Sequence, residues 1–277
     1  MPSSWWAVAL LAALAGCAPA AAPPPKAGLS QCQRDSLDTL YRDVFTVGTD
    51  QPVYPPWYMG DDPANGEGFE SALAYALAGK LGYAHDDVRW VRVPFNAALA
   101  PGPKQFDASL SEYSITEPRR AAVDFSSPYL DVSQAVVTVK SSPAATVHSI
   151  AGLKPLRLGA QVGTTSYSAA TAVDGQNPVA VYTTTGDAKL ALGSGEIDAL
   201  VADLPTAFAV ANEMRDGVIV GRLPAAGNVE QFGVVLTKGS DLTRCVSAAV
   251  DALRDDGTLA VLQDKWLTGA GKVPLLG

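Results

Sequence analysis

The sequence predicts an α/β protein built from two successive series of strands and helices. From residue 44 onward, short runs rich in β-branched and aromatic residues alternate with apolar residues at helical spacing. A Ser/Pro/Ala-rich segment after Lys140 separates the first series from the second. The composition is 48% hydrophobic and 17% charged, and is therefore typical of a chain that packs a core.

The first series begins with a β-rich run over Val44–Asp50 that ends in a turn. Apolar residues between Phe69 and Leu81 then recur at helical spacing, and Gly82 closes this helix. The other elements of the series are strands, predicted over 88–93, 106–110 and 135–140.

The second series has the same character. Its predicted strands cover 156–160, 179–182, 197–201 and 231–237. Its predicted helices cover 166–173, 187–192 and 205–214. The chain then continues over 242–266 as two helical stretches that are broken near Gly257.

The N-terminal residues have the pattern of an export signal. The apolar run Trp5–Ala15 is too short to span a bilayer, and it ends in Leu14-Ala15-Gly16-Cys17, which resembles the bacterial lipobox. We therefore expect removal of the signal peptide, residues 1–16, and lipidation of Cys17. Residues before the run include no Lys or Arg, so an ordinary signal cleaved near Ala20, or a true start upstream, is the alternative.

An Ala/Pro-rich segment follows Cys17 and cannot build a core, so residues 17–40 are expected to be a lipidated tether. The protein is then exported and held at the membrane by its lipid, in the periplasm or at the cell surface.

Composition argues against several classes of function. The net charge of −8 and the pI of about 4.7 oppose binding to nucleic acid. The two histidines, His85 and His148, lie far apart, and no Cys/His run has zinc spacing. We expect no metal, no cofactor and no catalytic residues, and we expect a monomer.

Several short motifs follow one another in an order typical of one family. They are Val47-Gly48-Thr49-Asp50, Tyr54-Pro55-Pro56-Trp57, Gly68-Phe69-Glu70, Ser114-Ile115-Thr116-Glu117-Pro118-Arg119, Asp124-Phe125-Ser126, Gly163-Thr164-Thr165-Ser166, Gly195-Glu196-Ile197-Asp198 and Asp256-Gly257-Thr258. With them the chain resembles the periplasmic amino-acid-binding proteins that feed ABC importers. The resemblance implies the type II periplasmic-binding fold, in which two α/β lobes joined by two crossover strands enclose a ligand cleft. Lobe 1 would comprise 41–136 and 232–277, and lobe 2 would comprise 137–231.

Two cysteines remain in the body, Cys32 and Cys245. Export would place them in an oxidising compartment, where a disulfide persists. The implied boundaries put both on lobe 1, which favours a disulfide between them, and two free thiols are the alternative.

The resemblance also assigns the ligand's charged groups. Arg119 matches the arginine that binds the ligand carboxylate, and its planar fork suits two parallel charge-assisted bonds. The alternative is that Arg119 is a first-turn residue of a helix capped by Ser114 or Thr116. Gly163, Thr164 and Thr165 are expected at the start of a helix, where free N–H groups attract a carboxylate. Plain N-capping by Thr165 or Ser166 is compatible with this role.

The ligand ammonium needs acceptors. Asp203 matches the acidic partner, with the Ser111 carbonyl and the Ser114 hydroxyl completing three bonds. For Asp203 the alternative is an N-cap before Pro205.

The side-chain end of the pocket is expected to involve Asp50, Tyr54, Phe95, Glu112 and Gln161. Two carboxylates beside aromatic faces favour a polar or cationic side chain. For Glu112 the alternative is exposure to solvent.

The sequence thus predicts a solute-binding lipoprotein that captures a polar or cationic amino acid and delivers it to an ABC permease. One alternative is a periplasmic cyclohexadienyl-type dehydratase, with Glu112 as the acid. Another is a ligand-sensing module without transport.

Overall fold

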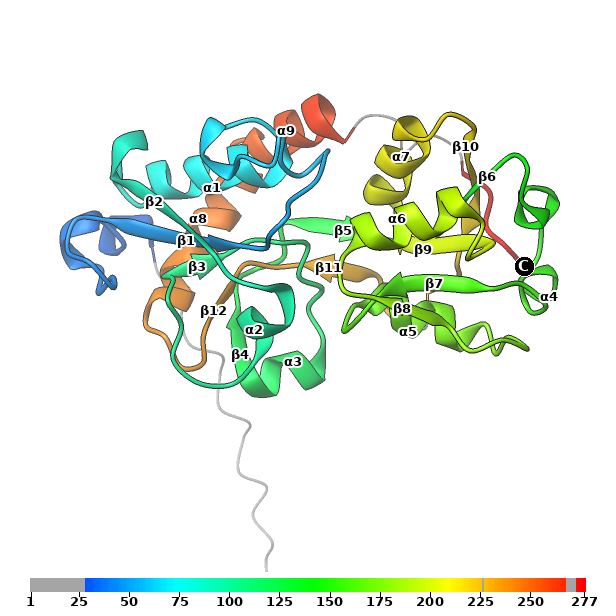
Figure 1. Ribbon diagram of the computed structural model, residues 1–277. Helices are drawn as coiled ribbons and strands as arrows, with labels where there is room; N and C mark the ends of the chain where they lie inside the picture. The colour runs from blue at the N-terminus through cyan, green and yellow to red at the C-terminus, as the bar shows by residue number, and fades with distance from the viewer. Residues whose placement is uncertain (1–27, 226, 268–272) are drawn as a thin grey trace, which may run out of the picture.

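The computed structural model describes residues 28–225, 227–267 and 273–277. The predicted signal peptide, the lipidation site at Cys17 and the tether up to residue 27 lie outside the described residues. The body forms two lobes side by side, each with a sheet flanked by helices (Figure 1). In the part of the chain that the structure describes, no helix is long and apolar enough to cross a membrane.

The first lobe contains a five-stranded sheet in the order β2-β1-β3-β12-β4. These strands are β1 (Phe45–Thr49), β2 (Val88–Arg92), β3 (Ala108–Ser109), β4 (Val123–Phe125) and β12 (Val235–Thr237). Strands β2, β1 and β3 are parallel, and β12 runs antiparallel to both of its neighbours. All five residues of β1 are buried, as befits a strand covered on both faces.

Helices cover both faces of this first sheet. One face packs against α1 (Phe69–Lys80), α8 (Leu242–Asp255) and α9 (Thr258–Trp266). The other face packs against α2 (Phe95–Leu99), and α3 (Glu117–Ala122) leads directly into β4. This layered arrangement leaves the carboxyl ends of the parallel strands facing the second lobe, where a ligand site is expected in an α/β sheet (Figure 1).

The second lobe contains a sheet in the order β10-β6-β9-β7-β8. Its strands are β6 (Gln134–Val139), β7 (Leu158–Gln161), β8 (Ala180–Tyr182), β9 (Ala199–Asp203) and β10 (Gly217–Arg222). One face packs against α4 (Ile150–Leu153) and α5 (Thr165–Ala172). The other packs against α6 (Thr185–Ser194) and α7 (Leu204–Glu213).

Two strands cross between the lobes. They are β5 (Leu130–Val132) and β11 (Glu230–Phe232), which pair antiparallel to each other. The single strand predicted over 231–237 is therefore wrong, because it is divided into β11 and β12 at Gly233. A Cβ on Gly233 would lie 2.8 Å from the Cδ1 atom of Ile115, so the Ile115 side chain would have to move to admit any other residue.

The N-terminal boundary differs from the prediction. Residues 28–40 were expected to be part of the tether, but short 3₁₀ turns over Leu29–Gln31 and Arg34–Ser36 pack them onto the first lobe. Cys32 is fully buried there and forms a disulfide with Cys245 of α8. The packed body therefore begins before residue 40, because a buried disulfide holds this segment.

The C-terminal boundary also differs. Residues 273–277 were expected in lobe 1, but they lie along β10 of the second lobe, where Leu275 pairs with Arg222. Leu276 is buried in the second lobe's core. Burial of this leucine and the paired backbone explain why the chain crosses back after α9.

Candidate functional site

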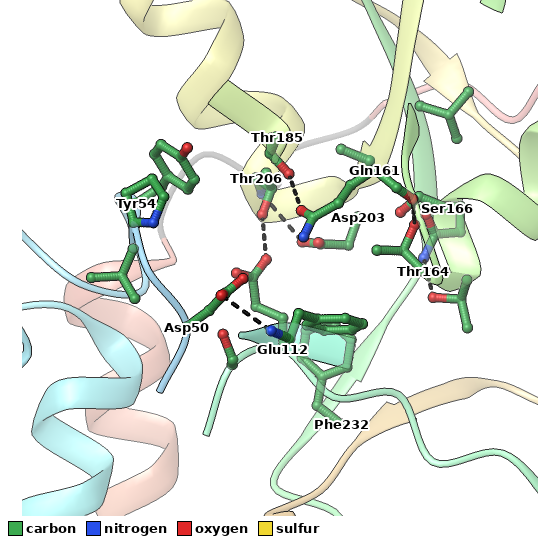
Figure 2. A pocket seen from close by; sticks show the side chains of 18 residues that line it. Asp50, Tyr54, Glu112, Gln161, Thr164, Ser166, Thr185, Asp203, Thr206 and Phe232 are labelled. Carbon is green, nitrogen blue, oxygen red and sulfur yellow. Dashed lines mark hydrogen bonds between the residues drawn. The ribbon is translucent and has the colours of Figure 1, made fainter. Parts of the chain in front are cut away.

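A cavity of about 50 Å³ lies between the lobes (Figure 2). Its lining residues come from both lobes: Asp50, Pro52, Val53, Tyr54, Phe95, Ser111, Glu112, Gln134, Gln161, Thr164, Thr165, Ser166, Thr185, Val201, Ala202, Asp203, Thr206 and Phe232. Most of the predicted site residues are among them. Ser114, Arg119 and Gly163 are not.

Strand ends position the polar groups of this cavity. Asp50 follows β1, the segment of Ser111 and Glu112 follows β3, and Asp203 is the last residue of β9. Strands β1 and β3 pair in parallel, so their carboxyl ends lie at one edge of the first sheet, and the carboxyl end of β9 reaches the same cavity from the second lobe. The cavity is therefore built by the sheet ends and by the helices that follow them.

The lining is acidic. It includes the carboxyl groups of Asp50, Glu112 and Asp203, and among these described residues it includes no Lys, Arg or His. Burial raises the pKa of Asp203 to about 6, because the charged form loses its water. Burial and the negative charge of Asp203 raise the pKa of Glu112 well above its usual range. The alternative in which Glu112 points to solvent is therefore wrong (Figure 2).

Asp50 is held in a defined orientation. Its Oδ1 accepts hydrogen bonds from the backbone N–H groups of Gln51 at 2.8 Å and Phe95 at 3.1 Å. Burial raises the pKa of Asp50, and these donors, with the Gln161 amide and the Arg92 charge, oppose the rise. The Asp50 carboxyl group is thus held by backbone N–H groups from its own turn and from the start of α2.

The helix starts in lobe 2 match the predicted capping only in part. Thr164, rather than Thr165 or Ser166, caps α5, with its Oγ1 accepting from the Tyr167 N–H at 3.1 Å. Asp203 caps α7 by accepting from the Thr206 N–H at 3.3 Å. Asp203 lines the cavity and caps the helix at once, so the predicted cap is present and the ligand-binding role of this residue stays a prediction.

Arg119 lies beside the cavity lining. Its Nη1 donates to the Ser114 carbonyl at 2.8 Å, and its Nη2 donates across the cleft to the Gly163 carbonyl at 3.0 Å. The guanidinium carbon also stands 5.4 Å from the centre of the Phe95 ring. Thr116, not Ser114, caps α3 by accepting from the Arg119 N–H at 3.4 Å.

Ser114 belongs to a cluster of hydrogen-bonded polar side chains at the crossover strands. Its Oγ donates to Glu230 Oε1 at 2.6 Å and lies 3.0 Å from Thr165 Oγ1. Gln134 Nε2 donates to Glu230 Oε2 at 2.9 Å. Glu230 therefore places a negative charge near Arg119, and this charge opposes the lowering of the arginine's pKa by burial.

Three hydrogen bonds across the lobes involve Thr206 or Gly186, two residues that no sequence pattern suggested. Trp57 Nε1 donates to Thr206 Oγ1 at 2.7 Å, and Thr206 Oγ1 donates to Glu112 Oε2 at 2.7 Å. The Gly186 N–H donates to the Tyr54 hydroxyl at 3.2 Å. Thr206 carries one local signal, its place three residues after Asp203 in a capped first turn, but nothing local reveals partners more than ninety residues away.

In the described residues no group of three or more His, Cys, Asp or Glu side chains is placed to hold a metal ion. The polar groups of the cavity surround a space of about 50 Å³. Carboxyl groups, hydroxyls and an amide converge on it from both lobes (Figure 2).

The chain resembles known proteins over most of its length. Residues 45–269 match the family described as bacterial extracellular solute-binding proteins, family 3. Over 225 residues the chain is 28% identical to the arginine-binding periplasmic protein of Mannheimia haemolytica, covering 79% of this chain and 90% of that protein.

Two solved structures share the fold. An ancestral arginine-binding protein bound to glutamine has a TM-score of 0.70 at 30% identity, covering 82% of this chain and 98% of the other. An ancestral amino acid-binding protein described as a precursor of cyclohexadienyl dehydratase has a TM-score of 0.69 at 30% identity, covering 82% and 96%. The predicted type II periplasmic-binding fold and the predicted family are both confirmed. The chain belongs to the bacterial extracellular solute-binding proteins, family 3.

Proposed function

We propose that this protein captures a cationic α-amino acid outside the cytoplasm and delivers it to an ABC importer. The charge of the cavity lining carries the proposal. Asp50, Glu112 and Asp203 bring three carboxyl groups into a small space that no positively charged side chain lines among the described residues. Buried charges require partners, and a ligand with an ammonium group and a cationic side chain supplies them.

The ligand's α-amino and carboxylate groups have candidate partners at one end of the cavity. Asp203 would accept from the α-ammonium, with the Ser111 carbonyl and the Ser114 hydroxyl. A guanidinium has five N–H groups, and Arg119 uses two of them in the bonds to Ser114 and Gly163. Its remaining donors and the N–H groups at the start of α5 are suited to the ligand carboxylate.

The other end of the cavity suits a cationic side chain. Asp50, Tyr54 and Glu112 line the cavity from lobe 1, and the Glu112 carboxyl group also lies close enough to Asp203 for the two to interact (Figure 2). Gln161 adds an amide whose Oε1 accepts from Thr185 Oγ1 at 2.9 Å. Charge pairing with the two carboxylates, and attraction of a cation to the aromatic face, favour a basic over an acidic or apolar side chain.

A ligand bonded to Asp203 of lobe 2 and to Asp50 and Glu112 of lobe 1 stabilises the closed arrangement by its contacts with both. This differential affinity is what makes binding a signal that a permease can read. We assign the protein no catalytic role and no cofactor, and we propose that it acts as a monomer.

Binding measurements test the proposal. We expect L-arginine and L-lysine to bind with a Kd between about nanomolar and micromolar, as roughly ten paired ligand atoms allow. L-glutamate should not bind, because its extra carboxylate meets an acidic lining. The Arg119→Ala variant should weaken binding of L-arginine by about 2–5 kcal/mol, because the ligand carboxylate loses its partner. Equal or tighter binding of L-glutamate, measured by calorimetry, would contradict the proposal.

Membrane attachment is a separate part of the proposal. Cys17 follows Leu14-Ala15-Gly16, and we propose that it carries the lipid that holds the body at the membrane. Replacing it by Cys17→Ser should move the protein from the membrane fraction to the soluble exported fraction, with ligand affinity unchanged. A variant that stays in the membrane fraction would remove this part of the proposal and leave the binding role intact.

A second candidate function follows from the buried Glu112. A carboxyl group whose pKa is raised by burial in a cleft can serve as a general acid, and one solved relative is described as a dehydratase precursor. The acidic lining, however, disfavours dicarboxylate substrates such as prephenate. Incubating the protein with prephenate and assaying for its dehydrated product distinguishes the two functions, and we expect no product.

A further inference from the structure

Glu70 is a buried carboxyl group that the proposed binding role does not use. It lies in the first turn of α1, is fully buried, and is not among the residues lining the cavity. Its Oε2 has no hydrogen-bond partner among the described residues. Burying a carboxyl group costs free energy because the group loses its water, and an apolar side chain would fill this position without that cost. The presence of a carboxyl group at residue 70 therefore needs an explanation other than packing.

The partners of its other oxygen supply that explanation. Glu70 Oε1 accepts from the Tyr129 hydroxyl and, at 2.8 Å, from the backbone N–H of Glu112. The bond to the Glu112 N–H joins α1 to the loop that lines the cavity. A backbone N–H paired with a buried carboxylate makes a stronger bond than one between neutral groups.

Glu112 has an unusual backbone that needs such a bond. Its φ is +56°, in the left-handed region that non-glycine residues rarely adopt. The flanking residues are also fixed, because the Leu110 carbonyl accepts from Tyr58 at 2.9 Å and the Tyr113 carbonyl accepts from the Gly233 N–H at 3.0 Å. Glu70 therefore holds the one residue of this loop whose conformation is strained.

The side chain of Glu112 is held from the opposite lobe. An indole N–H can only donate, so Trp57 donates to Thr206 and the Thr206 hydroxyl must give its single proton to Glu112 Oε2. Glu112 is thus held at two points. Glu70 of lobe 1 binds the Glu112 backbone N–H, and Thr206 of lobe 2 binds the Glu112 side-chain carboxyl group.

We propose that Glu70 is a positioning residue for ligand selection, whose bond to the Glu112 backbone turns that carboxyl group into the cleft and so sets the preference for a cationic over a neutral ligand side chain. This inference rests on the proposed binding of a cationic amino acid. It adds the residue, outside the cavity, on which the selectivity depends.

The test compares L-arginine with L-citrulline, which has nearly the same shape without the charge. The ratio of their dissociation constants reports selectivity rather than folding. We expect Glu70→Ala to reduce the preference for arginine about tenfold, because the left-handed turn loses its partner. Glu70→Gln keeps an oxygen that accepts from the Glu112 N–H and should retain the preference.

A matched control and a double variant separate positioning from general damage. Tyr129→Phe removes the other hydrogen bond of Glu70 and should leave the ratio unchanged. Glu112→Gly should lose the preference by itself, and adding Glu70→Ala to it should cause no further change.

Two outcomes would overturn the inference. A wild-type ratio in folded Glu70→Ala, or a further loss of preference when Glu70→Ala is added to Glu112→Gly, would show that Glu70 does not act through Glu112. A wild-type protein that binds neither probe would overturn the cationic-ligand proposal, and this inference with it. The two failures are therefore distinguishable.

Discussion

Asp203 and Glu112 approach each other from different lobes, and the proposed function implies that their protonation changes when a cationic ligand binds. In the ligand-free protein burial raises the pKa of Asp203 to about 6 and that of Glu112 well above its usual range. A bound ammonium beside these groups favours their charged forms and lowers both pKa values again. Binding of a cation therefore releases protons.

The affinity for L-arginine should accordingly depend on pH. Because the free protein holds more protons than the complex, the affinity falls as the pH decreases, by up to about tenfold per pH unit for each proton released. Calorimetry between pH 5 and pH 8 measures this slope. An affinity that is constant over this range, or that rises on acidification, contradicts the assignment of these carboxyl groups to the ligand. Glu112→Gln should give a shallower slope.

The stability of the ligand-free protein should change in the opposite sense. Burial raises the folded-state pKa of Glu70 from 4.5 to about 7, so this group favours the folded state most at low pH, and the contribution is lost as the pH rises through 7. The shift corresponds to roughly 3 kcal/mol. Thermal unfolding without ligand should therefore occur at a higher temperature at pH 5 than at pH 8. Glu70→Gln should reduce this difference, and an unreduced difference would show that other groups cause it.

At the scale of residues, the family motifs in the sequence predicted some of the residues that line the cavity, but they did not predict others. The resemblance to the family predicted Asp50 and Asp203 in the site. In the structure Asp50 follows β1 and Asp203 ends β9, so both lie at strand ends that line the cavity. Thr206 and Glu230 act through partners 94 and 116 positions away, which no local pattern shows. The left-handed backbone of Glu112 could not be predicted either, because glycine, and not glutamate, is the residue that indicates a positive φ in a sequence.

At the scale of elements, the long periodic segments were predictable, and so were some short strands such as β8, but several other short elements were not. The predicted helix from Phe69 to Leu81 corresponds to α1, whose buried residues recur along one side. Strands β4 and β5 have three residues each, and α2 has five, too few for a period to emerge. Their conformation comes from tertiary pairing, as in the bonds between β5 and β11.

The disulfide between Cys32 and Cys245 joins the N-terminal turns to α8. It links residues 213 positions apart, so it restricts the unfolded chain strongly. Replacing both by Cys32→Ser and Cys245→Ser should lower the free energy of unfolding by about 2–5 kcal/mol, as measured by urea denaturation. Because neither cysteine lines the cavity, the Kd for L-arginine should stay the same. A large loss of affinity for L-arginine with an unchanged free energy of unfolding would contradict the conclusion that the disulfide stabilises the fold without affecting ligand binding.

At the scale of the whole molecule, the lobes are joined by more than the two crossover strands. Lobe 1 ends in α9, yet Val273–Gly277 lies along β10 of lobe 2 (Figure 1). There the Arg222 N–H donates to the Pro274 carbonyl at 2.7 Å, and the Ile150 N–H donates to the Gly277 carbonyl at 3.0 Å. The segment lies beyond residues 45–269, where the family match ends. It forms a third connection between the lobes.

This connection depends on Leu276, which is 1% exposed and packs against Gly221, whose missing Cβ leaves the space. Leu276→Ala should destabilise lobe 2 by about 2–4 kcal/mol through the cavity it creates. It should also let the ligand-free lobes separate further, seen as a larger radius of gyration in X-ray scattering, while the ligand-bound radius stays the same. Leu275→Ala is the matched control, because Leu275 is 58% exposed and its loss leaves no cavity. If both variants have the same ligand-free radius of gyration, residues 273–277 lie on lobe 2 without restraining the separation of the lobes. If only Leu276→Ala opens the molecule, closure is governed from the C-terminal end as well as from the hinge.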